Sequence, residues 1–391
     1  MIDLHSLSEA TLAPPLPVRV LVVGVGGGGG VMAEELAQAG HLPAEFLAVD
    51  SDTQALQRHG RSARLAVGGR LTRGLGCGGD AVLARRCAES SRKSLAKHLE
   101  GADVVVLLAG LGGGMGTGGS SAIAEMAGES GALTLAMVAL PFDFEGLRVD
   151  LARAGLEKLL GAADSVICFP NQRVIDLQNE ERTARETFAA ANEIIHQGVR
   201  ATARLLRADG ILNVGLADLR ASLRGQRASS VLAHVEAEGE ARHQEILNKL
   251  LAHAAMESGH ALHTASAVVV SLVGGPELSA TEIDRLSRQI SAQCPGAKVM
   301  FGASVEDASR GRLGLTVIAS RPWEAPRTTA SPASATSSSA AAPRHRAAQR
   351  HQQQLALEPV SKGRFEKAER TLYHGEDLDV PAYIRHNVVL D

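Results

Sequence analysis

A glycine-packed turn is the feature of this sequence best suited to chemistry. Gly112–Gly119 follows an apolar run, Val104–Ala109, that predicts a buried strand, and it precedes Ser120–Ala127, which predicts the first turns of a helix. Backbone N–H groups at a helix start lack intrahelical partners, and the helix dipole favours negative charge there. Glycine removes the side chains that would keep a phosphate from the backbone, so we predict an anion site. The alternative is a flexible glycine loop without a ligand.

A second glycine run lies near the beginning of the chain. Gly24–Gly30 follows a strand expected at Val18–Val23 and precedes a helix expected from Val31 to about Ala39. The next strand, Glu45–Val49, ends at Asp50. A G-x-G-x-x-G spacing with an acidic residue ~20 positions later is typical of dinucleotide-binding folds. A nicotinamide-dependent enzyme is therefore one alternative function.

The elements that would position these loops alternate between strand and helix. A third glycine-rich loop spans Gly68–Asp80. Periodicity then predicts a helix at 81–99, a strand at 132–140, a helix at 147–160 and a strand at 165–169. Such alternation implies right-handed crossovers and a parallel sheet covered on both faces. Because ligands bind outside the carboxyl ends of such strands, the glycine loops are expected to share one crevice.

The second half of the sequence predicts a different arrangement. A long helix is expected over 182–208, followed by a loop at 211–218. A charged helix, a strand and a helix opened by a capping box follow, at 241–256, 265–273 and from Ser279. Two strands, 298–305 and 313–319, are expected to pair across a polar turn. The order strand, helix, paired strands predicts a smaller α+β domain.

Composition restricts the class of protein. The chain has 391 residues, of which 45% are hydrophobic but only 3% aromatic, so the core must be built mainly from small aliphatic side chains. The net charge of −3 gives no attraction to nucleic acid, and no apolar run reaches the ~20 residues of a membrane span. The N-terminus lacks signal-peptide order, and the four cysteines show no paired or metal-ligand spacing. We therefore expect a cytoplasmic protein with reduced thiols, in which Cys77 is a small loop residue rather than a nucleophile.

These patterns divide the chain into six segments. They are a flexible arm (1–17), a nucleotide-binding domain (18–181), a central helix (182–209), an α+β domain (210–322), a linker (323–376) and a tail (377–391). The linker is rich in Ala, Ser, Pro, Arg and Gln and cannot bury enough apolar surface to offset chain entropy, so we expect it to be disordered. The tail motif Asp379–Arg385 combines apolar and aromatic residues, which is typical of a short docking peptide.

The order of these motifs resembles that of the tubulin/FtsZ family. Gly112–Gly119 is similar to its GGGTGTG signature, and Gly24–Gly30, Asp50–Asp52 and Gly74–Gly78 are similar to its first three phosphate loops. Pro141–Gly146 is close to the family pattern PFxFEG, and Asp379–Arg385 is similar to the FtsZ tail peptide. The resemblance implies a tubulin/FtsZ-like α/β fold, with a Rossmann-like parallel sheet that binds GTP, a long central helix and a second α+β domain.

The resemblance also implies roles for individual residues. Backbone groups of the glycine loops would hold the phosphates, at Gly26, Gly27, Gly28, Gly29, Gly30, Gly76, Gly113, Gly114, Gly116 and Gly118. Thr117 would add a hydroxyl, Glu145 would contact the ribose, and Arg148 would substitute for an arginine that the family has at the next position. Asn171 and Glu193 would contact the guanine edge, and Phe188 would stack on the base. Mg²⁺ would bridge phosphate oxygens and offset charge, without a dedicated protein ligand.

For the family, hydrolysis takes place between neighbouring subunits. Asn213 and Asp218, in the loop after the long helix, would act on the GTP of the next subunit, so that assembly and GTPase activity are coupled. The resemblance thus implies a filament-forming GTPase of the bacterial division ring. Its partners would be further copies of itself, another FtsZ with which it co-assembles, and membrane-tethering division proteins that bind the tail at the inner face of the membrane.

Several residues depart from the family pattern. The family loop reads NxDxxD, whereas this chain has Gly215 at the first carboxylate position. Met115 replaces a threonine, Val31 replaces an asparagine, and Val149 stands where an arginine is expected, with Arg148 one position earlier. Loss of one carboxylate predicts slower hydrolysis, by ~10²–10⁴-fold. The alternative function within the family is therefore a GTP-binding regulator that hydrolyses poorly and co-assembles with another FtsZ.

Overall fold

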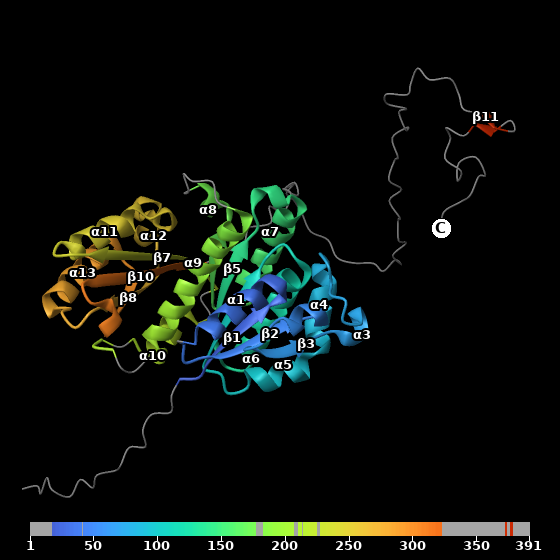
Figure 1. Ribbon diagram of the computed structural model, residues 1–391, viewed down its shortest axis with the longest axis horizontal. Coiled ribbons are helices and arrows are strands. Elements are labelled where there is room, and N and C mark those ends of the chain that lie inside the picture. Colours follow the sequence, from blue (N-terminus) through green and yellow to red (C-terminus); the bar gives the residue numbers. More distant parts are fainter. Residues whose placement is uncertain are drawn as a thin grey trace, which may run out of the picture. The chain divides into compact units, whose positions relative to one another are not determined.

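The computed structural model describes residues 18–40, 42–176, 183–206, 210–212, 214–224, 227–322, 372–373 and 376–377 (Figure 1). The chain divides into two compact units, residues 1–327 and 328–391. In the second unit the described residues form two short antiparallel strands, β11 (Leu372–Tyr373) and β12 (Glu376–Asp377). The predicted arm, most of the predicted linker and the tail motif Asp379–Arg385 lie outside the described residues.

A ten-stranded sheet runs through the described part of the first unit, in the order β3-β2-β1-β4-β5-β6-β7-β10-β8-β9. The strands from β3 to β7 are all parallel; the alternating sequence pattern predicted this for β1, β2, β4, β5 and β6 but did not indicate β3 or β7. Their bounds are β1 (Val20–Val25), β2 (Glu45–Asp50), β3 (Ala63–Ala66), β4 (Val104–Gly110), β5 (Leu133–Leu140), β6 (Ser165–Pro170), β7 (Ala228–Glu238), β8 (Ala267–Gly274), β9 (Lys298–Val305) and β10 (Arg312–Pro322).

Helices cover both faces of the parallel part of the sheet. Alternate residues of β1 and β4 point to opposite faces, so Val23 and Val105 join one core cluster while Val22 and Val106 join another. The first cluster packs against α4 (Ala81–Ser90), α5 (Arg92–Leu99), α6 (Ser120–Glu129) and α7 (Leu147–Leu160); the second packs against α1 (Gly26–Ala39) and α9 (Ala184–Leu205). Burial on both faces explains why these strands read as continuous apolar runs.

The long helix α9 confirms the helical periodicity of its segment. Thr183 caps it in a reciprocal box with Glu186, and the helix extends over 22 residues. Ile195 and Val199 are fully buried against the sheet. Figure 1 shows α8 (Gln172–Asp176) at one end of α9 and α10 (Leu216–Leu223) at the other. The helix therefore separates two ends of the first unit by ~33 Å.

The last four strands form a mixed region with its own core. A third cluster joins side chains of β7, β8 and β10 to α11 (Arg242–Ala252) and α13 (Ala280–Gln293). The predicted pairing of 298–305 with 313–319 is wrong, because β9 pairs with β8 in parallel and β10 lies between β7 and β8, antiparallel to both. The connection between β9 and β10 therefore crosses over β8. Sequence reasoning also missed β7, whose apolar and polar residues alternate.

Several element boundaries differ from the predictions. Helix α1 begins at Gly26 instead of Val31, so the glycines form its first turns. A π-helical turn, Met115–Gly119, leads into α6, and residues 216–223 form α10 where a loop was expected. The remaining short helices are α2 (Thr53–Gln57), α3 (Gly69–Thr72) and α12 (His260–His263). None of the helices in the described ranges is both long enough and apolar enough to cross a bilayer.

A buried arginine joins the two helices of the third core. Arg242, at the start of α11, donates from Nε and Nη2 to the two carboxylate oxygens of Glu282 on α13, at 2.8 and 2.9 Å. Its Nη1 donates to Glu277 Oε1 at 2.9 Å. The arginine side chain is only 7% exposed, so its loss leaves two carboxylates without their counter-charge.

We therefore expect Arg242→Met to lower the free energy of unfolding by about 3 kcal/mol. Arg288→Met is the matched control, since Arg288 forms a solvent-exposed salt bridge to Asp284. This substitution should change the free energy of unfolding by less than about 0.5 kcal/mol. Denaturant titration of both variants measures the difference. Equal effects would contradict a structural role for the Arg242 network.

Candidate functional site

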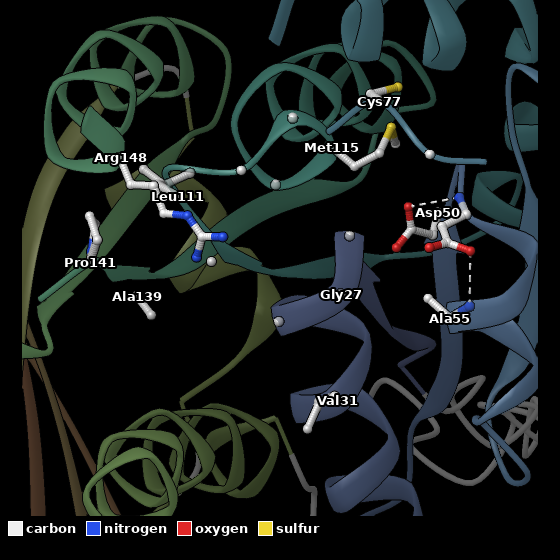
Figure 2. Close-up of a pocket in the computed structure, with 18 of the residues that line it drawn as sticks. Gly27, Val31, Asp50, Ala55, Cys77, Leu111, Met115, Ala139, Pro141 and Arg148 are labelled. Carbon is white, nitrogen blue, oxygen red and sulfur yellow. Dashed lines mark hydrogen bonds between the residues drawn. The ribbon is translucent and has the colours of Figure 1, made fainter. Parts of the chain in front are cut away.

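The carboxyl ends of the parallel strands open into one cavity of about 780 Å³ (Figure 2). Its walls come from the segments that follow β1, β2, β3, β4, β5 and β6, and from the first turns of α9. The predicted site residues that line it are Gly26, Gly27, Gly28, Gly76, Gly113, Gly114, Gly116, Glu145, Arg148, Asn171 and Phe188. Three glycine loops that are distant in sequence thus share one crevice.

One end of the cavity is made of backbone. Gly26 has a φ of +72°, and a Cβ there would lie 2.9 Å from the backbone nitrogen of Gly116. The N–H of Gly114 donates to the carbonyl of Gly78 at 2.8 Å, which joins the third loop to the glycine-packed turn. At Gly27 and Gly113 an added Cβ would meet no atom within 4 Å, so both face open space. The start of α1 and these loops present a cradle suited to an anion.

The other predicted glycines lie behind this surface, where packing requires them. A Cβ on Gly29 would lie 2.2 Å from the Leu108 carbonyl oxygen, and one on Gly118 would lie 1.8 Å from that of Ala81. A Cβ on Gly30 would lie 2.7 Å from the ring of His59. These glycines let α1 and the π-helical turn approach neighbouring segments, and they do not line the cavity.

Thr117 is also placed differently from the expectation. Its side chain is buried, and its Oγ1 accepts the N–H of Gly112 at 2.8 Å. Its methyl group fills space beside α7, where a Cβ on Gly155 would lie only 2.2 Å away. The hydroxyl therefore fixes the shape of the turn from behind and does not line the cavity. Met115, in contrast, lines the cavity edge.

At the other end of the cavity lie groups that suit a flat polar ring. Phe188 is 44% exposed and packs edge-on against Phe142, with ring centroids 5.0 Å apart. The Asn171 side chain is buried, and its Oδ1 has no hydrogen-bond partner among the described residues. Asn192 lines the cavity one helical turn after Phe188 and donates to Glu35 at 3.2 Å. Asn171 belongs to the cavity wall, so a ligand bound there would be able to supply the donor that its buried oxygen lacks.

Glu193 does not reach the cavity. Its carboxylate accepts from Arg200 at 2.7 Å and lies 3.6 Å from the Nδ1 of His196. Asn192 occupies the position that sequence reasoning gave to Glu193. The signal that could have identified it is the helical spacing, since residues four apart share one face and Phe188 is four residues earlier.

Two side chains after β5 lie at the cavity rim. Glu145 Oε1 accepts the N–H of Phe142 and its Oε2 accepts from Arg148, both at 2.9 Å. Figure 2 shows the Arg148 guanidinium extending into the cavity. A Cβ on Gly112, which has a φ of +102°, would lie 2.9 Å from the Arg148 carbonyl oxygen. The glycine-packed turn and α7 therefore fix the position of this cation together. Arg58 also lines the cavity, which adds a second positive charge.

Asp50 and Asp52 are carboxylates on the cavity wall. Asp50 Oδ1 accepts the N–H groups of Ser51 and Asp52, at 2.7 and 3.1 Å, and burial raises its pKa. Asp52 Oδ1 caps α2 through two N–H groups at 2.8 and 3.1 Å. Across the described ranges, no group of three or more His, Cys, Asp or Glu side chains could hold a metal ion alone. Mg²⁺ typically binds through one or two carboxylates plus phosphate oxygens, so this wall fits an ion that arrives with a phosphate ligand.

Asp218 lies far from this cavity. It is exposed in the first turn of α10, beyond the far end of α9, and its Oδ2 accepts the N–H of Gly215 at 3.2 Å. Asn213 lies outside the described residues. Asp218 and the predicted nucleotide-binding residues that line the cavity therefore occupy opposite ends of α9 (Figure 1).

Fold and site together define a tubulin-like α/β protein with a glycine-rich backbone cradle at the carboxyl edge of its parallel sheet. Residues 19–179 match the Tubulin/FtsZ family, GTPase domain, and residues 229–321 match the FtsZ family, C-terminal domain. The cell division protein FtsZ of Caulobacter vibrioides is 34% identical over 307 residues, which cover 78% of this chain and 60% of that protein. The chain belongs to the tubulin/FtsZ family.

Solved structures agree with this assignment. The FtsZ dimer of M. jannaschii matches with a TM-score of 0.71 and 27% identity, over 78% of this chain and 88% of that one. CetZ2 from Haloferax volcanii, at 24% identity and a TM-score of 0.62 over 77% and 92% of the two chains, shares the fold. The chain spans about three fifths of the length of the curated FtsZ proteins that it matches.

His196 makes the stability of the region behind Asn192 depend on pH. Its ring lies on α9, with Nε2 3.4 Å from Glu35, and Glu193 and Arg200 lie on the same helix. Burial lowers the pKa of His196 below its ordinary value of 6.5, against the raising effect of the two glutamates. The unfolded chain therefore binds this proton more readily than the folded one.

The stabilisation from neutral His196 is thus complete above pH 6.5 and is lost as the pH falls below that value. We expect thermal stability to decrease between about pH 7 and pH 5 in the unmodified chain, and to decrease less in His196→Gln, which cannot titrate. Melting curves at several pH values measure this. An unchanged pH dependence in the variant would contradict the assignment.

Proposed function

We propose that the cavity binds GTP and that the protein is a GTPase active between head-to-tail neighbours. The observation that carries the proposal is the division of the cavity into a backbone cradle at one end and a buried, unpaired amide oxygen beside an aromatic ring at the other. The first end suits phosphates and the second suits a purine. Family membership and the description of the matching FtsZ structure as a dimer support the proposal.

The base would be recognised by Asn171 and Asn192. Asn171 Oδ1 would accept from the ring, which satisfies its present lack of a donor. Asn192 and Phe188 project from one face of α9, so the amide would meet the ring edge while the phenyl group contacts its face. Arg148 and Arg58 would offset the phosphate charge. A Mg²⁺ bound with the phosphates would neutralise charge as the terminal phosphate leaves.

Hydrolysis would need a second copy of the chain. Asp218 lies beyond the far end of α9, which is ~33 Å long, so it cannot reach the cavity of its own chain. Exposed apolar side chains occur in both regions: Leu75 lines the cavity and Phe144 and Leu147 flank its residues in sequence, whereas Ile211 and Leu212 lie shortly before α10. Two different patches that fit each other make a heterologous contact, which repeats into an open filament.

Turnover would be slow, because Gly215 offers no carboxylate. Asp218 would remain to polarise the attacking water, yet it now accepts the N–H of Gly215. This feature favours a second candidate function, a GTP-loaded regulator that co-assembles with another FtsZ and hydrolyses little. The tail motif Asp379–Arg385 would bind membrane-tethering division proteins and hold the filament at the cytoplasmic face of the division site.

A first test concerns the base. We expect Asn192→Ala to weaken GTP binding by about 5- to 10-fold, the usual effect of one lost hydrogen bond, with Glu193→Ala as the matched control at less than about 2-fold. Titration calorimetry measures both affinities, with NAD as competitor. A larger effect at Glu193 would contradict the assignment, and displacement of GTP by NAD would favour the dinucleotide alternative.

A second test concerns hydrolysis. Gly215 has φ −71° and ψ 151°, which any residue can adopt, so an aspartate fits there with a small shift of the Asp218 carboxylate. We expect Gly215→Asp to raise phosphate release by ~10²-fold and to make the rate per molecule rise with protein concentration. Gly215→Asn is the control, since it caps α10 equally well but adds no charge.

Equal rates in the aspartate and asparagine variants would show that the missing carboxylate does not limit turnover. A rate per molecule that stays independent of concentration, with no GTP-dependent pelleting alone or with another FtsZ, would contradict the head-to-tail proposal.

A further inference from the structure

Two thiols lie in contact at the wall of the cavity. The Sγ atoms of Cys77 and Cys87 are 3.6 Å apart, and the Cys77 Sγ lies 3.2 Å from the Ser51 hydroxyl. All four cysteines of the chain belong to the described residues and are free, and this pair is the one in contact. Cys77 lines the cavity on the third loop, as Figure 2 shows, whereas Cys87 is fully buried in α4.

The positions of the two thiols connect them to the cradle. Gly76 and Gly78, on either side of Cys77, line the cavity, and the Gly78 carbonyl accepts the N–H of Gly114. A Cβ on Gly114 would lie 3.0 Å from the Cβ of Cys77, so the glycine-packed turn rests directly on this cysteine. Cys87 is held by α4, and its Sγ fills the space that Gly68 leaves without a side chain. Displacement of Cys77 would therefore move the cradle.

We propose that Cys77 and Cys87 are a redox site, which a peroxide converts to a disulfide that weakens nucleotide binding. The Cys77 sulfur attacks one peroxide oxygen, the O–O bond breaks, and the leaving oxygen takes the thiol proton; with hydrogen peroxide the products are a sulfenic acid and water. The Cys87 sulfur then attacks the Cys77 sulfur, the S–O bond breaks, and the hydroxyl leaves as water with the Cys87 proton. Two thiols and one hydrogen peroxide thus give one disulfide and two waters.

The geometry assigns the two roles. Cys77 is the site of first attack because it borders the cavity, through which a small peroxide can enter. Cys87 is fully buried behind Cys77, and burial raises the pKa of its thiol to about 12, so it is not the first thiol to react and is left to resolve the sulfenic acid with which it is in contact. A disulfide requires the sulfurs to approach to about 2.05 Å, so the loop of Cys77 must shift toward α4.

The effect on nucleotide binding rests on the proposed function. Because the shift displaces Gly76 and Gly78, which line the cavity, the oxidised protein binds GTP less tightly, by about 10-fold. Linkage makes the effect reciprocal, so bound GTP disfavours the disulfide. Nucleotide in the cavity also covers the approach to Cys77, which slows its oxidation.

The first experiment detects the bond itself. The nucleotide-free full chain is treated with hydrogen peroxide, alkylated, and digested with trypsin without reductant. Cleavage at Arg73, Arg85, Arg86 and Arg92 places Cys77 and Cys87 on different peptides, 74–85 and 87–92. We expect these two peptides to be joined by a disulfide within one chain, with no disulfide between chains. Cys168 and Cys294 should be found alkylated. Unlinked peptides, with Cys77 either alkylated or oxidised alone, would overturn the proposal.

The second experiment measures GTP affinity before oxidation, after it, and after reduction by dithiothreitol. We expect an about 10-fold loss that reduction reverses, and no linked peptides from Cys87→Ala. Unchanged affinity in fully cross-linked protein would overturn the coupling. If the reduced protein does not bind GTP at all, the proposed function fails, and the presence or absence of linked peptides still decides the redox site.

Discussion

At the cavity the backbones of the glycine loops lie in direct contact, and the rest of the structure depends on this constraint. Gly26 and Gly116 approach so closely that a side chain on the first would lie 2.9 Å from the nitrogen of the second. Gly116 itself lies where a Cβ would be 2.0 Å from the Gly110 carbonyl oxygen. Such contacts draw the ends of β1 and β4 together and leave N–H groups directed outward at the start of α1. The sheet supplies the parallel strand ends, and glycine allows them to converge.

The length of α9 is the second constraint. The helix carries Phe188 and Asn192 at the cavity and brings the chain to α10 at its far end. A rigid spacer of 22 residues prevents the two ends of one chain from meeting, so any chemistry that combines them requires two chains. Assembly and catalysis would then depend on the same contact, and a change such as glycine at position 215 can alter turnover without altering the cavity.

Most polar side chains of the cavity wall already form hydrogen bonds within the protein. Asp50 and Asp52 accept backbone N–H groups, and Glu145 accepts from Phe142 and Arg148. Asn171 Oδ1 differs because it is buried without a donor. The contrast separates groups whose hydrogen bonds shape the cavity from an acceptor that has no donor among the described residues. Cys77 lies between these cases, since it borders the cavity and touches a second thiol behind it.

Local patterns in the sequence determined the strands, most helices and the glycine loops, because periodicity and turn chemistry depend on near neighbours. The glycine loops predicted Gly27 and Gly113 as site residues, the family resemblance added Asn171 and Phe188, and the structure brings these four together. Only the tertiary structure determined strand order and side-chain direction, which depend on residues remote in sequence. It separated β9 from β10, since strand order depends on which edges are free. It turned Glu193 toward Arg200 and Thr117 into the interior, because the direction of a side chain depends on neighbours remote in sequence. It also placed the Cys77 and Cys87 thiols in contact, which no spacing of cysteines indicated.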